Sequence, residues 1–291
     1  MHESNILVLL CHGCVPECVF HPLRSGSRTQ HPDRWGTTPS VVPTTYRRDL
    51  PVTPFPTRAA IATRSDAQNA TIAALEAETM ELYAQSVPAV VSIEIPFVHP
   101  PVDGMTSTRS FMLSQGSGFL YNDQGHIVTN AHVVAQADIY QIRLGASSVI
   151  SATVIGRDTE HDIAVLALDT PAPIGPLSMS ARTPATGMWI MTIGSPYGLQ
   201  DSMTLGTISA TNREFSTDST TLTGMIQIDA VLNPGSSGGV LIDRTGAVIG
   251  LTTAIQSSTG SFEGIGYAIP ASAIVEHADA LIAAAMQDRT P

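Results

Sequence analysis

The sequence contains no lysine, and its fourteen basic residues are all arginines. Only 13% of the 291 residues are charged and the formal net charge is -11, so the chain offers no basic surface for the phosphates of a nucleic acid. The absence of lysine does not indicate a function, because arginine can replace lysine at most solvated positions. Composition therefore indicates an ordinary globular protein with acidic character.

Cysteine and long apolar runs are also scarce. The cysteines are confined to Cys11, Cys14 and Cys18, so everything after them must fold without a disulfide, and cysteine usage does not identify the redox compartment. The longest apolar run near the start covers residues 6–10, far short of a membrane span or the hydrophobic region of a secretory signal. The sequence predicts no membrane span and no ordinary signal peptide.

The sequence predicts that residues 1–66 form a disordered leader or targeting segment. Residues 21–65 are rich in Pro, Thr, Ser and Arg and show neither helical nor strand periodicity, which is typical of a transit peptide and equally of a segment upstream of the true start. A competing hypothesis is a small zinc site made by the three cysteines with His12 and His21, since thiolates and imidazoles chelate zinc. Their spacing fits no compact zinc module, which favours the leader.

Order is predicted to begin with a helix over residues 67–87. Residues 88–291 follow, with about twelve short β-branched segments at roughly ten-residue spacing, separated by Gly, Asn, Asp and Pro. This pattern predicts antiparallel barrels or sandwiches. Residues 270–287 place apolar side chains on one helical face and predict a closing helix.

A serine hydroxyl is an effective nucleophile only when a base takes its proton and a carboxylate fixes the tautomer of that base. Most of the nine histidines lie in the leader, in turn-like contexts or on the closing helix, which leaves His132 and His161. His132 stands where a strand ends, in IVTNAHVV. Asp162 stands at the mouth of an apolar run, in TEHDIAVLAL, where a carboxylate can be partly buried and still hydrogen-bonded.

Two adjacent serines, Ser236 and Ser237, lie between glycines in NPGSSGG. Glycines on both sides permit a tight turn whose backbone amides point inward together, as an oxyanion hole requires. The composition of this turn does not by itself say which of the two serines is the nucleophile.

Four stretches of the chain resemble the protease domain of HtrA/DegP-type serine proteases: SGFLYNDQGHIVTNAHVV, HDIAVLAL, TIGSPYGLQDSMTLGTISATNRE and IQIDAVLNPGSSGGVLIDRTGAVIGLTTAI. The resemblance covers roughly residues 88–274. It implies an all-β fold of two perpendicular antiparallel six-stranded barrels of the chymotrypsin type, with flanking N- and C-terminal helices and an active site between the barrels. Too few residues follow position 274 for a PDZ domain, so a PDZ-less member is expected.

The resemblance also assigns roles. It implies a catalytic triad of His132, Asp162 and Ser237, because Ser237 falls on the serine of the family pattern Gly-Asn-Ser-Gly-Gly and Ser236 replaces the asparagine. The oxyanion hole would be the turn of Gly235, Ser236 and Ser237, with the first and third amides holding the oxyanion and Ser236 as a spacer. Ser237 would attack the peptide carbonyl, while His132 transfers the proton.

In this fold the segment before the nucleophile lines the pocket for the residue preceding the cut. The expected pocket residues are Val231, Leu232, Asn233, Thr252 and Thr253. With no Asp or Glu at its base, the pocket should favour Val, Ala, Leu or Ile over Lys or Arg. The implied function is a serine endopeptidase that cleaves unfolded or damaged proteins in protein quality control, through an acyl-enzyme and without a cofactor or metal.

The competing function is a catalytically inactive homologue that binds polypeptides through the same cleft, and the three filled triad positions favour the protease. Expected partners are unfolded polypeptides, with no nucleic acid. A homotrimer formed through the helix around Leu82 and Tyr83 is left open. Family members work mostly outside the cytoplasm or in organelles, so the resemblance favours the periplasm, the cell envelope, secretion or an organelle, although no clear signal is visible.

Overall fold

The computed structural model describes residues 65–99, 109–145, 148–217 and 220–288. From Leu75 onward the described chain forms one compact unit, whereas the first turns of the N-terminal helix, up to Ala74, belong to a second unit. Nearly all of the expected leader, including every residue of the competing zinc hypothesis, lies outside the described residues.

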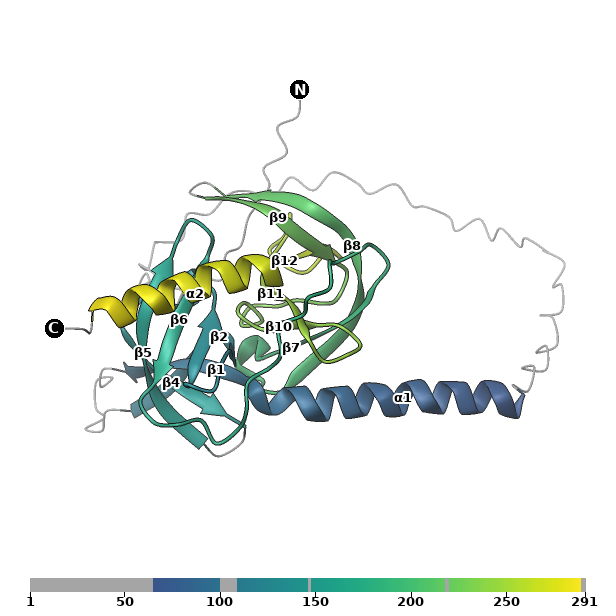
Figure 1. Ribbon diagram of the computed structural model, residues 1–291, viewed down its shortest axis with the longest axis horizontal. Helices are drawn as coiled ribbons and strands as arrows, with labels where there is room; N and C mark the ends of the chain where they lie inside the picture. The colour runs from purple at the N-terminus through teal and green to yellow at the C-terminus, as the bar shows by residue number, and fades with distance from the viewer. Residues whose placement is uncertain (1–64, 100–108, 146–147, 218–219, 289–291) are drawn as a thin grey trace, which may run out of the picture. The chain divides into compact units, whose positions relative to one another are not determined.

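The first six strands close into an antiparallel barrel in the order β1-β2-β3-β6-β5-β4 (Figure 1). Along β4, Tyr140, Ile142 and Leu144 are buried and alternate with more exposed residues, because successive side chains of a strand point to opposite faces. The strands are β1 Val90–His99, β2 Arg109–Leu120, β3 His126–Thr129, β4 Ile139–Leu144, β5 Ser148–Asp158 and β6 Ile163–Leu168.

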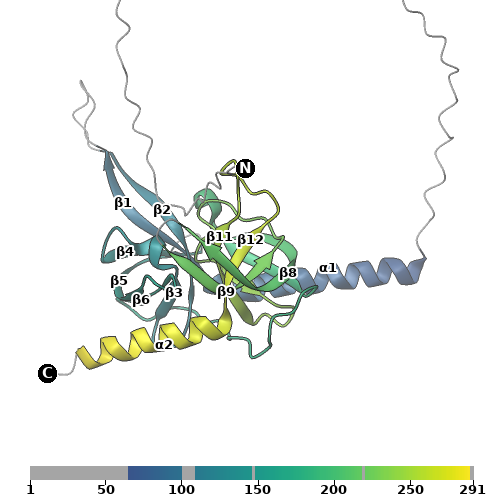
Figure 2. The same ribbon diagram turned by 90° about the horizontal axis from the view of Figure 1, so that it is seen from above.

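A second antiparallel barrel has the order β10-β11-β12-β9-β8-β7, and Figure 2 shows it beside the first. Every residue of β11 is buried, because this strand packs into the barrel core and also contacts the C-terminal helix. The strands are β7 Trp189–Gly194, β8 Ser202–Ser216, β9 Thr221–Ile228, β10 Val240–Ile242, β11 Val248–Ile255 and β12 Gly266–Pro270. The predicted all-β architecture of two six-stranded barrels with flanking helices is confirmed.

The C-terminal helix α2, Ala271–Asp288, packs against β5 and β6 of the first barrel and against β11 and β12 of the second (Figure 1). Its apolar face buries Ile274 and Ile282. Gly156 on β5 permits the close approach, since a Cβ there would lie 2.9 Å from Cδ2 of Leu281. The helix therefore joins the two barrels on the side where β5 leads into β6.

The N-terminal helix α1 spans Asp66–Ser86 and passes through a 3-10 turn, Val87–Ala89, into β1. Leu82 and Tyr83 pack partly against the core, and the Tyr83 hydroxyl donates a hydrogen bond of 2.6 Å to the backbone oxygen of Asp201. Leu75 and Met80, by contrast, are exposed.

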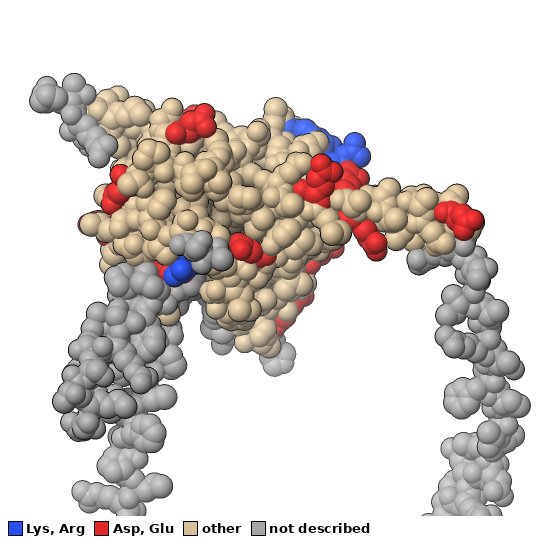
Figure 3. All heavy atoms as spheres, turned by 90° about the horizontal axis from the view of Figure 1, so that it is seen from below, with Lys and Arg blue, Asp and Glu red and all other residues tan. Residues whose placement is uncertain are grey.

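Figure 3 shows one face of the molecule, where charged side chains are scattered, mostly acidic, and form no continuous basic surface. None of the helices in the described ranges is long and apolar enough to cross a membrane.

Candidate active site

His132 and Asp162 come from two turns of the first barrel. His132 lies in the 3-10 turn Ala131–Val134 that directly follows β3. Asp162 is the residue before β6, is 7% exposed and has a φ of +55°, in the left-handed region that Asp and Asn tolerate better than most residues. The turn between β5 and β6 thus aims a nearly buried carboxylate at the imidazole.

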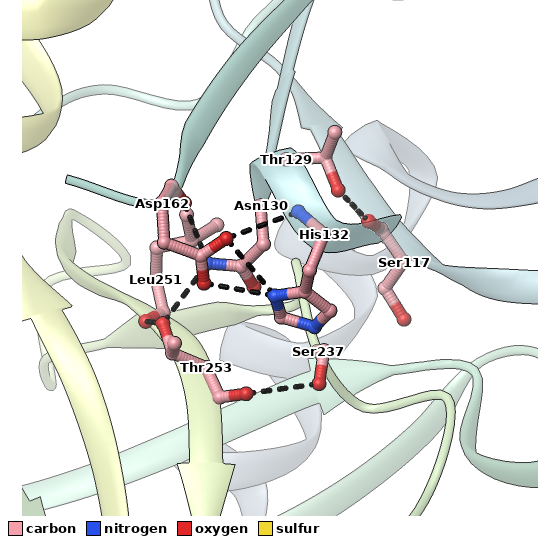
Figure 4. A network of polar contacts seen from close by, with 8 residues as sticks. All are labelled: Ser117, Thr129, Asn130, His132, Asp162, Ser237, Leu251 and Thr253. Atoms are coloured by element: carbon pink, nitrogen blue, oxygen red, sulfur yellow. Dashed lines mark hydrogen bonds and ion pairs between the residues drawn. The ribbon is translucent and has the colours of Figure 1, made fainter. Parts of the chain in front are cut away.

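The contacts between these two residues fix the imidazole. Nδ1 of His132 lies 2.8 Å from Oδ2 and 3.0 Å from Oδ1 of Asp162, and the His132 amide donates to Oδ1 at 3.0 Å (Figure 4). A carboxylate can only accept in these bonds, so the proton resides on Nδ1 and Nε2 is left as the proton acceptor. Asn130 holds the same turn by donating 3.0 Å hydrogen bonds to the Asp162 carbonyl and to Oγ1 of Thr253 in the second barrel.

Ser237 lies in the loop between β9 and β10 and is 6% exposed. Its hydroxyl donates to the backbone oxygen of Thr253 at 3.0 Å and not to His132. Nε2 of His132 is buried and has no hydrogen-bond partner in the described part of the chain. In Figure 4 the Ser237 hydroxyl lies on the Nε2 side of the ring, so this buried acceptor and the Ser237 hydroxyl face the same space.

The three backbone amides of the loop Gly235, Ser236 and Ser237 differ in whether they already donate a hydrogen bond within the chain. The Ser236 amide donates to the carbonyl of Asn233 at 2.8 Å. The amides of Gly235 and Ser237 donate to no acceptor among the described residues, which leaves two donors, two positions apart, for an incoming oxygen. Ser236 is thus the residue of the three whose amide is already bonded within the chain.

Glycine is required at two points of this loop. Gly235 has a φ of +94°, and a Cβ there would lie 2.6 Å from the carbonyl oxygen of Ser195. Gly238 has a φ of +84°, and its Cβ would collide with the carbonyl oxygen of Ser117. Both obstacles are backbone atoms, which cannot move aside as a flexible side chain can, so the two glycines fix the path of the loop.

Ser117 on β2 supports the loop and is a residue that the sequence analysis missed. Its hydroxyl donates to the Gly235 carbonyl at 2.7 Å and accepts from the Ser195 amide at 2.8 Å, and its own amide donates to the Ser237 carbonyl at 2.8 Å. The only sequence signal was its place between Gly116 and Gly118 at the start of the first matched stretch.

A small cavity of about 20 Å³ adjoins Ser237, and no charged residue lines it. Of the expected pocket residues, Leu232, Asn233 and Thr253 line the cavity. Val231 and Thr252 are not part of its lining. Val231 is 45% exposed, and the Thr252 hydroxyl donates to the Ser236 and Gly239 carbonyls. The complete lining is Leu232, Asn233, Pro234, Ser236, Ser237, Thr253, Ala254, Ile255 and Gly260.

Two antiparallel barrels with histidine and aspartate from one and serine from the other define the trypsin-like class of peptidase folds. Residues 116–251, which include all three side chains, match the trypsin-like peptidase domain family. The chain belongs, within that class, to the HtrA/DegP-type serine proteases.

Individual relatives support this assignment. "Protease Do-like 1, chloroplastic" of Arabidopsis thaliana is 37% identical over 214 residues, 71% of this chain and 48% of that protein. A "Probable periplasmic serine endoprotease DegP-like" of Pseudomonas savastanoi pv. phaseolicola is 37% identical over 195 residues, 67% of this chain and 40% of that protein. The solved structure "HtrA-type protease AlgW with decapeptide" superposes with a TM-score of 0.64 at 31% identity, covering 70% of this chain and 67% of the other. The chain thus spans less than half the length of the first two relatives.

Proposed function

We propose that this chain is a serine endopeptidase with Ser237 as the nucleophile, His132 as the general base and Asp162 as the carboxylate that orients it. The observation that carries the proposal is the state of the His132 ring: Asp162 holds Nδ1 with both oxygens, while Nε2 is buried, unpartnered and turned toward Ser237. The names of the relatives as proteases support the same reaction.

In the proposed reaction the Ser237 hydroxyl leaves the Thr253 carbonyl, gives its proton to Nε2 of His132 and attacks the carbonyl carbon of the substrate. The electron pair of the carbonyl moves to its oxygen, and the free amides of Gly235 and Ser237 stabilise that oxyanion. His132 then protonates the leaving amine, the C–N bond breaks, and an acyl-enzyme remains. A water molecule, deprotonated by His132, hydrolyses the ester and restores Ser237.

The bond from Ser237 to Thr253 does not oppose this mechanism strongly. Turning the hydroxyl from the Thr253 carbonyl to Nε2 exchanges one hydrogen bond for another, and a neutral hydrogen bond contributes only about 1 kcal/mol net. That is small beside the barrier reductions of roughly 8 kcal/mol or more that enzymes achieve. The arrangement is best understood as a resting state of a competent site.

The test of this proposal is labelling by a fluorophosphonate probe, which reacts only with an activated serine. We expect labelling of the wild type and of Ser236→Ala, and none of Ser237→Ala, with circular dichroism confirming that all three are folded. Ser236→Ala is the matched control because it removes a hydroxyl one position away. If Ser236→Ala abolished labelling and Ser237→Ala kept it, the register would be wrong.

A folded wild type that resists the probe would favour the competing hypothesis of an inactive polypeptide-binding homologue. That hypothesis gains no support from relatives that are named as proteases.

The cavity beside Ser237 supports a preference for small aliphatic residues before the cut. Leu232, Ala254 and Ile255 give the cavity apolar walls, and its lining offers no carboxylate to a basic side chain. Mass-spectrometric mapping of casein fragments should find cuts concentrated after Ala, Val, Ile or Leu. Cuts mainly after Lys or Arg would contradict this interpretation of the cavity.

The biological setting is part of the same proposal. We infer unfolded polypeptides as substrates, a role in protein quality control, and a location outside the cytoplasm or in an organelle, by analogy with relatives named as periplasmic and chloroplastic. A homotrimer is the assembly to be tested, by light scattering of the purified chain. Degradation of casein without degradation of a stably folded protein is the expected substrate pattern.

A further inference from the structure

The turn that leads to Asp162 carries a compact group of side chains with no part in the proposed reaction. The group consists of Asp158, the last residue of β5, His161, the neighbour of Asp162, and His277 on α2. Ligand atoms of the three side chains all lie within 4.8 Å of one another. Among the described residues, no other group of three or more His, Cys, Asp or Glu side chains has this spacing.

Asp158 is held in place by the turn itself. Its Oδ1 accepts hydrogen bonds of 3.0 Å from the amides of Glu160 and His161, which leaves Oδ2 for other partners. Nδ1 of His161 lies 2.8 Å from that Oδ2, and Nδ1 of His277 lies 3.0 Å from it. Two imidazoles from distant parts of the chain therefore converge on one carboxylate oxygen that the backbone has already positioned.

Charge favours a cation here. Asp158 brings a carboxylate to the group, and the neighbouring Glu160 adds a second carboxylate on the exposed side of the turn.

We propose that Asp158, His161 and His277 bind a divalent transition-metal ion of the zinc type. Two imidazole nitrogens and one carboxylate oxygen form a ligand set that suits Zn²⁺, whereas Mg²⁺ and Ca²⁺ take oxygen ligands. Three protein ligands leave the fourth tetrahedral position to water, and solvent reaches the site because the His161 side chain is 44% exposed.

The separations between Oδ2 of Asp158 and the two imidazole nitrogens are close to those of an occupied site. With metal–ligand bonds of 2.0–2.1 Å, neighbouring ligand atoms of a tetrahedral site are about 3.3 Å apart. The present separations of 2.8 and 3.0 Å from Oδ2 need to widen only slightly. The ion would take the place of the two Nδ1 protons that now close the group, and each neutral imidazole would then carry its proton on Nε2.

One rearrangement is required, because the rings of His161 and His277 are stacked with centroids 3.8 Å apart and planes at 21°. A metal ion lies in the plane of each imidazole that binds it, so the two rings must open until both Nδ1 lone pairs meet the ion. His161 is the ring that can swing, since it is 44% exposed against 19% for His277. Metal binding therefore exchanges ring stacking for coordination.

Occupancy would cross-link α2 to the turn that ends at Asp162. A ligand that binds the folded chain but not the unfolded chain stabilises it by mass action. At a free Zn²⁺ concentration about 100-fold above Kd, the melting temperature should rise by roughly 5–10 °C for a domain of this size.

The experiment uses the full chain with Cys11→Ser, Cys14→Ser and Cys18→Ser, so that thiolates do not contribute. Melting temperature is measured in EDTA, in Zn²⁺ and in Mg²⁺ for this background and for His161→Gln, His277→Gln and Glu160→Gln added singly. Glutamine keeps a hydrogen-bond donor for Asp158 but is not a zinc ligand of this kind. Glu160→Gln is the matched control, because it removes a charge from the same turn without removing a proposed ligand.

We expect the Zn²⁺-induced rise in the background and in Glu160→Gln, and its loss in His161→Gln and His277→Gln. Co²⁺ should give the visible absorption of a tetrahedral site in the background and not in His277→Gln. A background that Zn²⁺ does not stabilise, an equal rise in His277→Gln, or the same rise with Mg²⁺ would overturn the proposal. None of these readouts depends on Ser237, so the result is separate from the test of the proposed protease activity.

Discussion

Replacing Gly235 by alanine tests whether the proposed activity depends on the shape of the oxyanion loop, which consists of Gly235, Ser236 and Ser237, as well as on the Ser237 hydroxyl. At its φ of +94° a side chain is strained, and a Cβ would lie 2.6 Å from the Ser195 carbonyl oxygen and 3.0 Å from the Tyr197 amide nitrogen. Because both neighbours are backbone atoms, the loop itself must shift. The Gly235 amide then leaves its place beside the amide of Ser237.

The two consequences of this substitution differ in size. Losing one oxyanion donor lowers kcat by about 10²- to 10³-fold, or about 3–4 kcal/mol of transition-state stabilisation. Left-handed backbone on alanine costs about 1–2 kcal/mol of the free energy of unfolding, to which the contact with Ser195 adds. Domains are stable by about 5–15 kcal/mol, so Gly235→Ala should still fold while losing most of its turnover.

The assay is steady-state hydrolysis of a fluorogenic peptide with a small aliphatic residue before the cut, with urea unfolding of the same samples. Gly187→Ala is the matched control, because Gly187 has a φ of +88° and open space where a Cβ would be. The control should lose a similar amount of stability from strain and keep the wild-type kcat. If kcat of Gly235→Ala were within threefold of kcat of Gly187→Ala, the Gly235 amide would not be an oxyanion donor.

Three further substitutions test the surroundings of the loop. Asp162→Asn should lower kcat about 10⁴-fold with an unchanged circular dichroism spectrum, because the amide presents a donor to Nδ1 and favours the wrong tautomer; a loss below tenfold would contradict the orienting role. Ser117→Ala removes the hydroxyl that joins the Gly235 carbonyl to the Ser195 amide, so urea unfolding should show a loss of about 1–3 kcal/mol and kcat should fall at least tenfold, whereas an unchanged kcat would show that the loop holds itself. Burial acts to raise the pKa of Asp243, but hydrogen bonds from Thr245 and the ion pair with Arg182 hold it below its usual value. The folded carboxyl thus binds protons less readily than the unfolded one, and its contribution is complete above about pH 4 and lost as pH falls through the lower folded pKa. The stability gap between wild type and Asp243→Asn, measured in urea, should therefore be wide at pH 7 and shrink toward pH 3, and a constant gap would refute this.

The strand pattern predicted antiparallel barrels or sandwiches, and the family resemblance implied the two six-stranded barrels that the structure has. Along β4 the apolar residues Tyr140, Ile142 and Leu144 are buried, and the polar residues between them are more exposed, as the alternation in the sequence predicts. The breaks between strands fall at Gly, Asn and Asp. The choice of Ser237 over Ser236 came from the resemblance to the family pattern Gly-Asn-Ser-Gly-Gly, because the turn alone left both serines open. In the loop, only the Ser236 amide is already bonded within the chain.

Other features depend on contacts between distant segments, which a local pattern does not contain. Val231 and Leu232 are adjacent and both apolar, yet Val231 is exposed and Leu232 lines the cavity. Which of the two side chains points inward is decided by the tertiary structure around them. Gly260 reaches the cavity from a loop beyond β11, and Ser117 reaches the oxyanion loop from the other barrel. The hydroxyl direction of Ser237 was equally beyond sequence reasoning, since it depends on where the Thr253 carbonyl lies.

Thr253 joins the two halves of the site through separate atoms. Its backbone oxygen accepts from the Ser237 hydroxyl, while its Oγ1 accepts from Asn130, whose amide group also donates to the Asp162 carbonyl. Asn130 thus links the turn before β6 to the residue that accepts from the Ser237 hydroxyl. The same turn begins at Asp158, whose Oδ2 lies 3.0 Å from Nδ1 of His277 on α2.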